Sequence, residues 1–335
     1  MKKLSFISFI VLVLLCMSCR KNKTDVINNN NTHTDTIHTS PPQLFEYLIL
    51  PSATNSAIVT YNNVHEVLID TRIVLKNKLF VFLPGTTGMP TAYKLIVKKA
   101  ASLGYHTIGL MYPNGTDIYT AAANSTDNTL FGKCRQEIFD GIDHTSGVSV
   151  DQNNCIQNRL LQLLLYLKSH YPTQQWDQFL VNNEIDWSKI IIAGHSQGGG
   201  HAFYIAKKVA VAKAIAFSSI DWNSSLGISA DWIAQAGATP INKYYSINAL
   251  KDQIFSYTNV VTQLNDLGIQ GPAISIDTNN PPYNNTHTLT TNATPAFNLL
   301  FPDHNITCLD TYVPKDVLGN EASSFSNAWE YMITQ

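Results

Sequence analysis

The sequence predicts an α/β fold in which helices cover both faces of a mostly parallel central sheet. Two observations predict it. From residue 44 to the end of the chain, short apolar runs of strand length alternate with longer stretches of helical periodicity. Several of these runs, such as 78–83 and 189–193, are apolar at nearly every position. Strands that are covered on both faces of a parallel sheet have this composition.

The predicted elements follow one another with short connections. The run 78–83 stops at Pro84-Gly85, and the helical stretch 92–103 stops at Gly104, because these residue types end regular structure. The other predicted strands are 45–50, 66–73, 106–111, 189–193, 214–218, 243–247 and 272–276, and the other predicted helices are 156–170, 201–211, 257–267 and 323–332.

Residues 112–153 interrupt the alternation with clusters of Asn, Gly, Asp and Thr. Long irregular segments inside compact domains are usually functional or disordered. We expect this one to be an irregular cap or loop insertion over the carboxyl edge of the sheet, where ligands bind in α/β proteins. The alternative is a loop without a role in the site.

The first 18 residues have the pattern of a bacterial export signal. Lys2 and Lys3 precede an apolar run from 6 to 15 that is too short to span a bilayer. The small residue Ser18 before Cys19 resembles the cleavage site of bacterial lipoproteins, in which the cysteine becomes the lipidated N-terminus. We therefore predict a signal peptide at 1–18 and a lipid anchor on Cys19; the alternative is a cleaved signal without lipid.

Residues 19–43 are rich in Asn and Thr and contain too few apolar side chains to form a core. We interpret them as a flexible tether that joins the lipid to one domain, residues 44–335. The predicted location is the cell envelope of a bacterium, facing either the periplasm or the outside.

The balance of charged residues argues against a nucleic-acid-binding function. Lys and Arg total 22 and Asp and Glu total 24, so no basic surface for nucleic acid is expected.

Exported proteins meet an oxidising compartment. Three cysteines follow the predicted lipid anchor: Cys134, Cys155 and Cys308. We predict a Cys134–Cys155 disulfide because these two are closest in the sequence, with Cys308 left free. Such a bond could contribute roughly 3 kcal/mol.

The most informative motif is Gly194-His195-Ser196-Gln197-Gly198. It has the pattern Gly-x-Ser-x-Gly between a predicted buried strand and a predicted helix. In a tight strand–turn–helix connection the serine backbone is strained, and small residues two positions away provide clearance. The turn also places Ser196 at a helix N-terminus, whose positive end favours a developing anion.

Residues 194–201, read as GHSQGGGH, resemble the nucleophile turn of the α/β-hydrolase superfamily, and most closely that of a poorly characterised group of bacterial secreted hydrolases. The resemblance extends over about residues 44–335. It implies the α/β-hydrolase fold and a nucleophilic Ser196, but it hardly constrains the substrate.

The resemblance also implies where an oxyanion would bind. One donor in this fold is the backbone N–H of the residue after the nucleophile, here Gln197. The second comes from the loop after the third strand, and residues 84–88 resemble that loop. The N–H of Thr86 is the expected donor, with Thr87 next. Pro84 stands where related loops have His, but the donor is a backbone group.

The chain order of the catalytic groups in this fold is serine, acid, histidine. Asp252 follows the predicted strand 243–247 and is the expected acid, with Asp221 as the competitor. Only His287 and His304 follow Asp252. His304 is the expected base because it lies before the terminal helix, and His287 remains the alternative.

We therefore predict a serine hydrolase that cleaves an ester or amide, in a small molecule or a polymer, through an acyl-enzyme. A carboxylic ester is the expected substrate rather than a peptide. No metal-binding or nucleotide-binding motif is present, so no cofactor or metal is predicted. The alternative is a non-catalytic envelope lipoprotein that binds a ligand in the cleft of a hydrolase fold.

Overall fold

The computed structural model describes residues 41–269 and 271–335. Its central strands are β1 (Leu44–Ile49), β2 (His65–Asp70), β3 (Leu79–Leu83), β4 (His106–Gly109), β7 (Ile190–His195), β8 (Lys213–Phe217), β11 (Tyr244–Ala249), β12 (Ile274–Ser275) and β13 (Thr288–Thr291). Two short hairpins are β5 (Leu180–Val181) with β6 (Glu184–Ile185), and β9 (Trp222–Asn223) with β10 (Ile228–Ser229). The helices are α1 (Pro51–Thr54), α2 (Lys94–Ser102), α3 (Ile118–Ala122), α4 (Leu130–Asp140), α5 (Ile156–His170), α6 (Gln197–Lys208), α7 (Tyr257–Leu267), α8 (Pro302–Asn305) and α9 (Ser323–Thr334).

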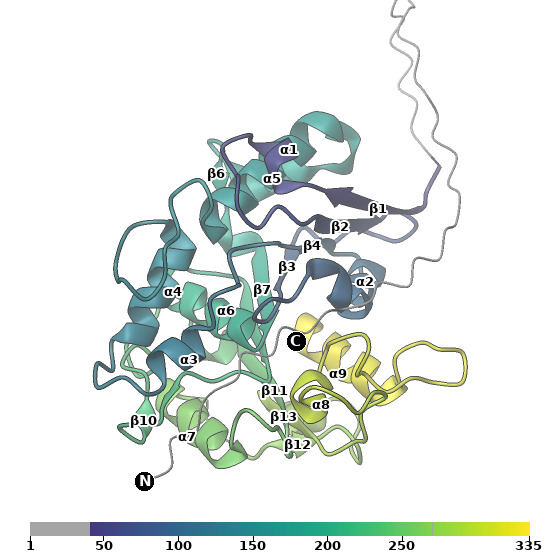
Figure 1. Cartoon of the computed structure of the whole chain (residues 1–335). Helices are drawn as coiled ribbons and strands as arrows, with labels where there is room; N and C mark the ends of the chain where they lie inside the picture. The colour runs from purple at the N-terminus through teal and green to yellow at the C-terminus, as the bar shows by residue number, and fades with distance from the viewer. Residues whose placement is uncertain (1–40, 270) are drawn as a thin grey trace, which may run out of the picture. The chain divides into compact units, whose positions relative to one another are not determined.

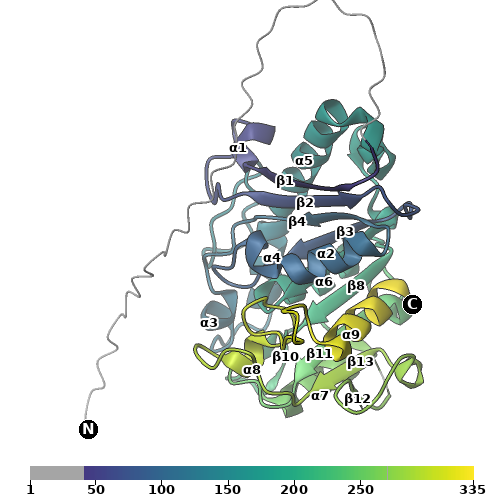
Figure 2. The same ribbon diagram turned by 90° about the vertical axis from the view of Figure 1, so that its right-hand side faces the viewer.

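The central strands form one nine-stranded sheet in the order β1-β2-β4-β3-β7-β8-β11-β13-β12. The strand β2 is antiparallel to both of its neighbours, and every other neighbouring pair is parallel. Figure 2 shows this order from β1 at the top to β12 at the bottom. The prediction of an α/β fold with a mostly parallel sheet is confirmed.

Apolar side chains that alternate along each central strand build two cores. In β3, Leu79, Val81 and Leu83 face the layer that contains α4, α5, α6 and α7. Phe80 and Phe82, on the other side of the strand, pack with α2 and α9. Helices therefore cover both faces, as Figure 1 shows. The parallel strands end at one edge of this sandwich, which brings the loops after β3, β7 and β11 together.

Two of the differences from the sequence prediction concern larger parts of the fold, the strand β13 and residues 112–153. The strand β13 was not predicted, because its sequence Thr-Leu-Thr-Thr lacks an apolar run. Residues 112–153 are more regular than predicted, because they contain α3 and the 11-residue helix α4. Buried side chains of α4, such as Phe131 and Ile138, join the core beside α5 and α6, which explains why this segment is helical.

The prediction of a Cys134–Cys155 disulfide is wrong, because Cys134, Cys155 and Cys308 are free thiols. Cys134 packs inside α4. Cys155 precedes α5, where its Sγ accepts a hydrogen bond from the N–H of Asn158 at 3.4 Å. Both thiols are buried, and burial raises the pKa of each.

No helix within residues 41–269 and 271–335 is long and apolar enough to cross a membrane. The predicted signal peptide, Cys19 and most of the predicted tether lie outside the described residues.

One buried carboxylate predicts how stability depends on pH. Glu66 of β2 is completely buried, and neither carboxylate oxygen has a hydrogen-bond partner among the described residues. The nearest cation, Lys94 Nζ, is 3.9 Å from Oε1. Burial therefore raises the pKa of Glu66 from 4.5 to about 7, although Lys94 opposes the shift.

Because this pKa is higher in the folded state than in the unfolded state, ionisation of Glu66 opposes folding. The stability contributed by the protonated form of Glu66 is fully present below pH 4.5 and is lost as the pH rises to about 7. Glu66→Gln should remove that dependence. As the pH rises from 4.5 to about 7, the free energy of unfolding of the variant should therefore increase relative to that of the wild type by on the order of 3 kcal/mol. Urea unfolding at several pH values checks this, with Glu184→Gln in an exposed hairpin as the control. A constant difference between Glu66→Gln and wild type would contradict it.

Candidate active site

Ser196 lies in a sharp turn between the end of β7 and the start of α6. Its backbone has φ 52° and ψ −120°, a conformation that L-residues rarely adopt. The turn requires glycine on both sides. A Cβ on Gly194 would lie 2.4 Å from the backbone of Gly198, and one on Gly198 would lie 2.1 Å from the Leu83 carbonyl oxygen. This close approach holds the serine at the N-terminus of α6, beside the loop that follows β3.

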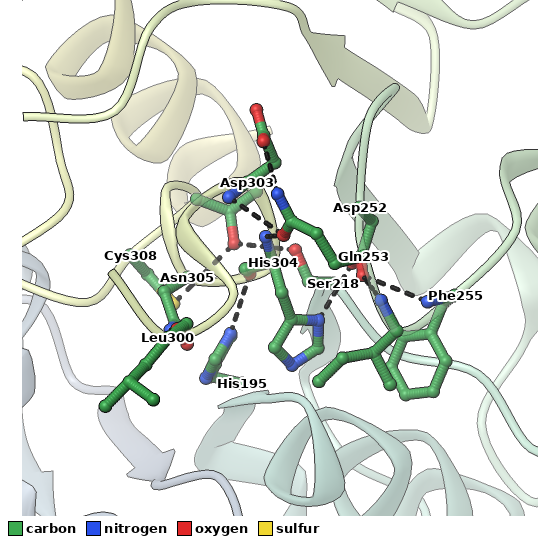
Figure 3. Close-up of polar contacts among 12 residues, drawn as sticks. His195, Ser218, Asp252, Gln253, Phe255, Leu300, Asp303, His304, Asn305 and Cys308 are labelled. Atoms are coloured by element: carbon green, nitrogen blue, oxygen red, sulfur yellow. Dashed lines mark hydrogen bonds and ion pairs between the residues drawn. The ribbon is translucent and has the colours of Figure 1, made fainter. Parts of the chain in front are cut away.

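His304 and Asp252 are joined by a buried hydrogen bond, drawn in Figure 3. Asp252 follows β11, His304 lies in α8, and His304 Nδ1 is 2.8 Å from Asp252 Oδ2. Each side chain is only 3% exposed. The other carboxylate oxygen, Oδ1, accepts the N–H groups of Ile254 and Phe255 at 2.8 and 3.0 Å.

This geometry determines which imidazole nitrogen is available for chemistry. An ionised carboxylate can only accept hydrogen bonds, so the Nδ1 of His304 carries the proton that Asp252 accepts. In the neutral ring the Nε2 of His304 then has a free lone pair. That nitrogen is buried and has no hydrogen-bond partner among the described residues. A histidine oriented in this way is suited to accept a proton.

Gln253 joins the loop that contains Asp252 to the segment that contains His304. Its side-chain oxygen accepts the backbone N–H groups of Asp303 and His304 at 3.1 and 3.2 Å. Its amide nitrogen donates to the Asp303 carboxylate at 2.5 Å. These contacts, visible in Figure 3, fix α8 against the end of β11 and so fix the orientation of His304.

Ser196 and His304 line the same cavity, but no hydrogen bond joins their side chains in the described part of the chain. Catalytic hydrogen bonds are often long or poorly aligned in a site without substrate. The structure therefore places Ser196 and His304 in the lining of one cavity, without a hydrogen bond between their side chains.

The loop after β3 offers one free backbone donor beside Ser196. The N–H of Gly85 donates to the Tyr93 hydroxyl, that of Thr87 to the Asn114 carbonyl at 3.0 Å, and that of Gly88 to the Gly85 carbonyl. The N–H of Thr86 has no partner among the described residues. Since Thr87 is engaged, Thr86 remains the better candidate for an oxyanion donor.

Gln197 is the first residue of α6, and the first N–H groups of a helix have no partner within it. Its side-chain oxygen accepts from the Thr86 hydroxyl at 3.1 Å, which joins the two predicted donor segments directly. Asn114 secures the same loop by donating to the carbonyl oxygens of Gly85 and Gly88 at 2.7 and 2.9 Å.

A buried chain of hydrogen bonds through His195 connects the loop after β3 to His304. His195 Nε2 is 3.1 Å from the carbonyl oxygen of His304 and therefore donates to it. In the neutral ring Nδ1 then accepts from the Tyr93 hydroxyl, 3.0 Å away, and that hydroxyl accepts the N–H of Gly85. Burial, reinforced by the nearby His304, lowers the pKa of His195 to about 3, so the ring is neutral.

Sequence reasoning did not find Tyr93. The positions that this network joins are 85, 93, 195 and 304, and no local pattern links residues so far apart in the chain. The only signal in the sequence was the position of His195 next to Ser196.

Of the two alternative candidates, Asp221 already has an ion-pair partner and His287 lies away from the cavity. Asp221 follows β8 and lines the cavity, but both of its carboxylate oxygens pair with the buried Arg135 guanidinium at 2.5 Å. Trp232 also donates to it, at 2.9 Å. His287 comes just before β13, so it lies at the opposite end of a parallel strand from the cavity. Its Nδ1 is 2.9 Å from the Tyr244 carbonyl oxygen.

The cavity has a volume of about 840 Å³. Ser196, His304 and Thr86 line it together with Gln197, and residues 117–119 and Arg135 show that part of the 112–153 segment forms one wall. Within the described residues, no group of three or more His, Cys, Asp or Glu side chains is arranged to hold a metal ion. No protein-family model matches the chain, and no curated protein matches its sequence.

Proposed function

We propose that this protein is a serine hydrolase of the α/β-hydrolase superfamily that cleaves a carboxylic ester through an acyl-enzyme. The observation that carries the proposal is the buried Asp252–His304 hydrogen bond, because it leaves the Nε2 of His304 without a partner among the described residues, and His304 lines the same cavity as the strained Ser196 turn. The positions of these residues in the chain, serine then acid then histidine, and their loops after parallel strands agree with that superfamily.

In the proposed reaction Ser196 Oγ attacks the ester carbonyl carbon while its proton passes to His304 Nε2. Asp252 keeps Nδ1 protonated and stabilises the imidazolium that forms. The carbonyl oxygen becomes an oxyanion, which the N–H groups of Thr86 and Gln197 stabilise. The carbon–oxygen bond of the ester then breaks, and the leaving alkoxide takes the proton from Nε2.

The second half of the reaction uses the same groups with water. His304 removes a proton from a water molecule as the water oxygen attacks the acyl-enzyme carbonyl. The bond to Ser196 Oγ breaks, the serine recovers its proton from His304, and the carboxylic acid leaves. The net reaction is ester plus water to acid plus alcohol, without a cofactor.

A fluorophosphonate probe tests the proposal directly, because it phosphonylates activated serines. The purified domain should be labelled, and mass spectrometry should place the adduct on Ser196. A folded protein that is neither labelled nor active on a broad panel of esters and amides would instead be a ligand-binding module.

We further propose that the chain is exported and held at the cell envelope of a bacterium by a lipid on Cys19. The support is the positive start, the apolar run from 6 to 15 and the Ser18-Cys19 sequence. Cys19→Ala should lose both incorporation of a labelled fatty acid and membrane association, whereas Cys16→Ala should keep them. A wild-type protein that fractionates as soluble would contradict the proposal.

A further inference from the structure

We propose that the ester taken by this site is uncharged and carries an aliphatic chain, and that Leu300 and Phe301 are the residues that select it. This inference rests on the proposed hydrolase function and adds the substrate class to it. It is drawn from the lining of the catalytic cavity and from the loop that precedes His304.

The walls of the cavity are mostly apolar. Hydrophobic side chains from several segments line it together with the Ser196 turn, among them Met89, Ile118, Ile254, Phe255, Leu300 and Phe301. Apolar walls favour burial of hydrocarbon from the substrate.

Of the charged side chains in the lining, one Arg and one Asp neutralise each other, and a second Asp caps a helix. Arg135 and Asp221 are paired with each other and buried. Asp117 lies at the exposed end of α3, where its carboxylate accepts the N–H of Tyr119 and the hydroxyl of Thr120. No cation in the described lining is therefore free to receive a phosphate or carboxylate group, which argues against an anionic substrate.

The mouth of the cavity exposes large apolar side chains to solvent. Leu300 is 68% exposed, Phe301 is 52% exposed and Met89 is 50% exposed, and all three also belong to the cavity lining. Phe297 and Leu299, in the same loop, are exposed as well. Single exposed apolar residues are common, but a cluster that is continuous with a cavity indicates a binding surface.

The loop holds these side chains outward at a cost in backbone energy. Leu300 and Phe301 are consecutive residues with φ of 51° and 59°, in the left-handed region that disfavours side chains with a Cβ. Asn305 secures them, because its side chain donates to the Leu300 carbonyl at 2.8 Å and its N–H donates to the Phe301 carbonyl at 3.1 Å. Figure 3 shows Leu300 and Asn305 beside His304, on the same short segment as the base.

A chain bound at this mouth would lie next to the reacting groups. Leu300 and Phe301 come four and three residues before His304, so an aliphatic group that contacts them extends outward from the ester bond at Ser196. Two consecutive residues in this costly conformation that present apolar side chains at the cavity are expected to have a function, because strained backbone concentrates at binding and active sites.

The test is the dependence of kcat/KM on chain length. We would measure p-nitrophenyl acetate, butyrate, hexanoate and octanoate, together with a second series in which the alcohol chain lengthens. Complete burial of one methylene group raises kcat/KM by about fourfold. For the partly open mouth we expect about twofold per methylene, or on the order of 100-fold from acetate to octanoate.

Leu300→Ser with Phe301→Ser should reduce that octanoate-to-acetate ratio at least tenfold. Leu318→Ser is the control, because Leu318 is 82% exposed but does not line the cavity. The substituted side chains are exposed, so the variants should melt like the wild type, and labelling of Ser196 by a small fluorophosphonate should persist.

Three outcomes separate the proposals. A ratio that rises with chain length in either series and falls in the double variant supports the inference. A labelled, active wild type with a flat ratio in both series, or a rising ratio that the double variant keeps, overturns the inference and leaves the hydrolase function intact. A protein that the fluorophosphonate does not label overturns the hydrolase function itself.

Discussion

Replacing Ser196 by alanine should lower kcat on an ester substrate by about 10⁶-fold, leaving only a small residual rate. In the proposed reaction this hydroxyl forms the acyl-enzyme, and no neighbouring side chain can replace it in the turn. The residual rate would come from binding and from the backbone donors of Thr86 and Gln197, which the substitution leaves in place. Steady-state kinetics on p-nitrophenyl butyrate, measured beside fluorophosphonate labelling, checks this result.

The variant should fold like the wild type. The Ser196 side chain does not cap α6, and the turn depends on the close approach of Gly194 and Gly198 rather than on the hydroxyl. Ser256→Ala is a matched control, since Ser256 also precedes a helix, α7, without a side-chain cap. If Ser196→Ala melts like the wild type and keeps activity within about tenfold, far short of the expected loss, then Ser196 is not the nucleophile.

The parts of the site that are encoded locally could be predicted from the sequence. The strand, the tight glycine turn and the helix around Ser196 are consecutive in the chain, so one motif describes them. Asp252 and His304 could be placed only by their order relative to strands, which left Asp221 and His287 open. In the structure, Asp252 and His304 are hydrogen-bonded to each other, while His287 lies at the other end of β13.

The remaining parts depend on contacts between distant segments. Asp221 looked available because it follows a strand, and its partner Arg135 comes from a segment that appeared irregular. The Tyr93–His195 hydrogen bond joins residues 102 positions apart. The disulfide prediction failed because proximity in sequence does not determine whether two thiols meet with the required geometry.

Substitutions of Asp252 and His304 should also cause very large losses, for different reasons. His304→Ala removes the proposed proton acceptor and should lower kcat about as much as Ser196→Ala, because the two act as a unit in the proposed mechanism. Asp252→Asn keeps the shape of the acid but presents an amide N–H to His304. The stable arrangement then places the imidazole proton on Nε2, so this nitrogen can no longer accept the Ser196 proton in the proposed reaction, and a loss of about 10⁴-fold is expected.

Substitutions of Asp221 and His287, the alternative acid and base, should have much smaller effects on kcat. His287→Ala should retain most activity, because His287 lies outside the cavity lining. Asp221→Asn should chiefly lower stability, since loss of one partner from a buried ion pair typically costs about 3–5 kcal/mol. Kinetics must therefore be compared with thermal melting for each variant, and kcat taken per folded molecule. A folded Asp252→Asn protein within about tenfold of wild type, set against that expected loss, would remove Asp252 from the mechanism. If Asp221→Asn then lost kcat while still folded, the acid would be Asp221, and the Asp252–His304 hydrogen bond would serve only to hold α8 in place.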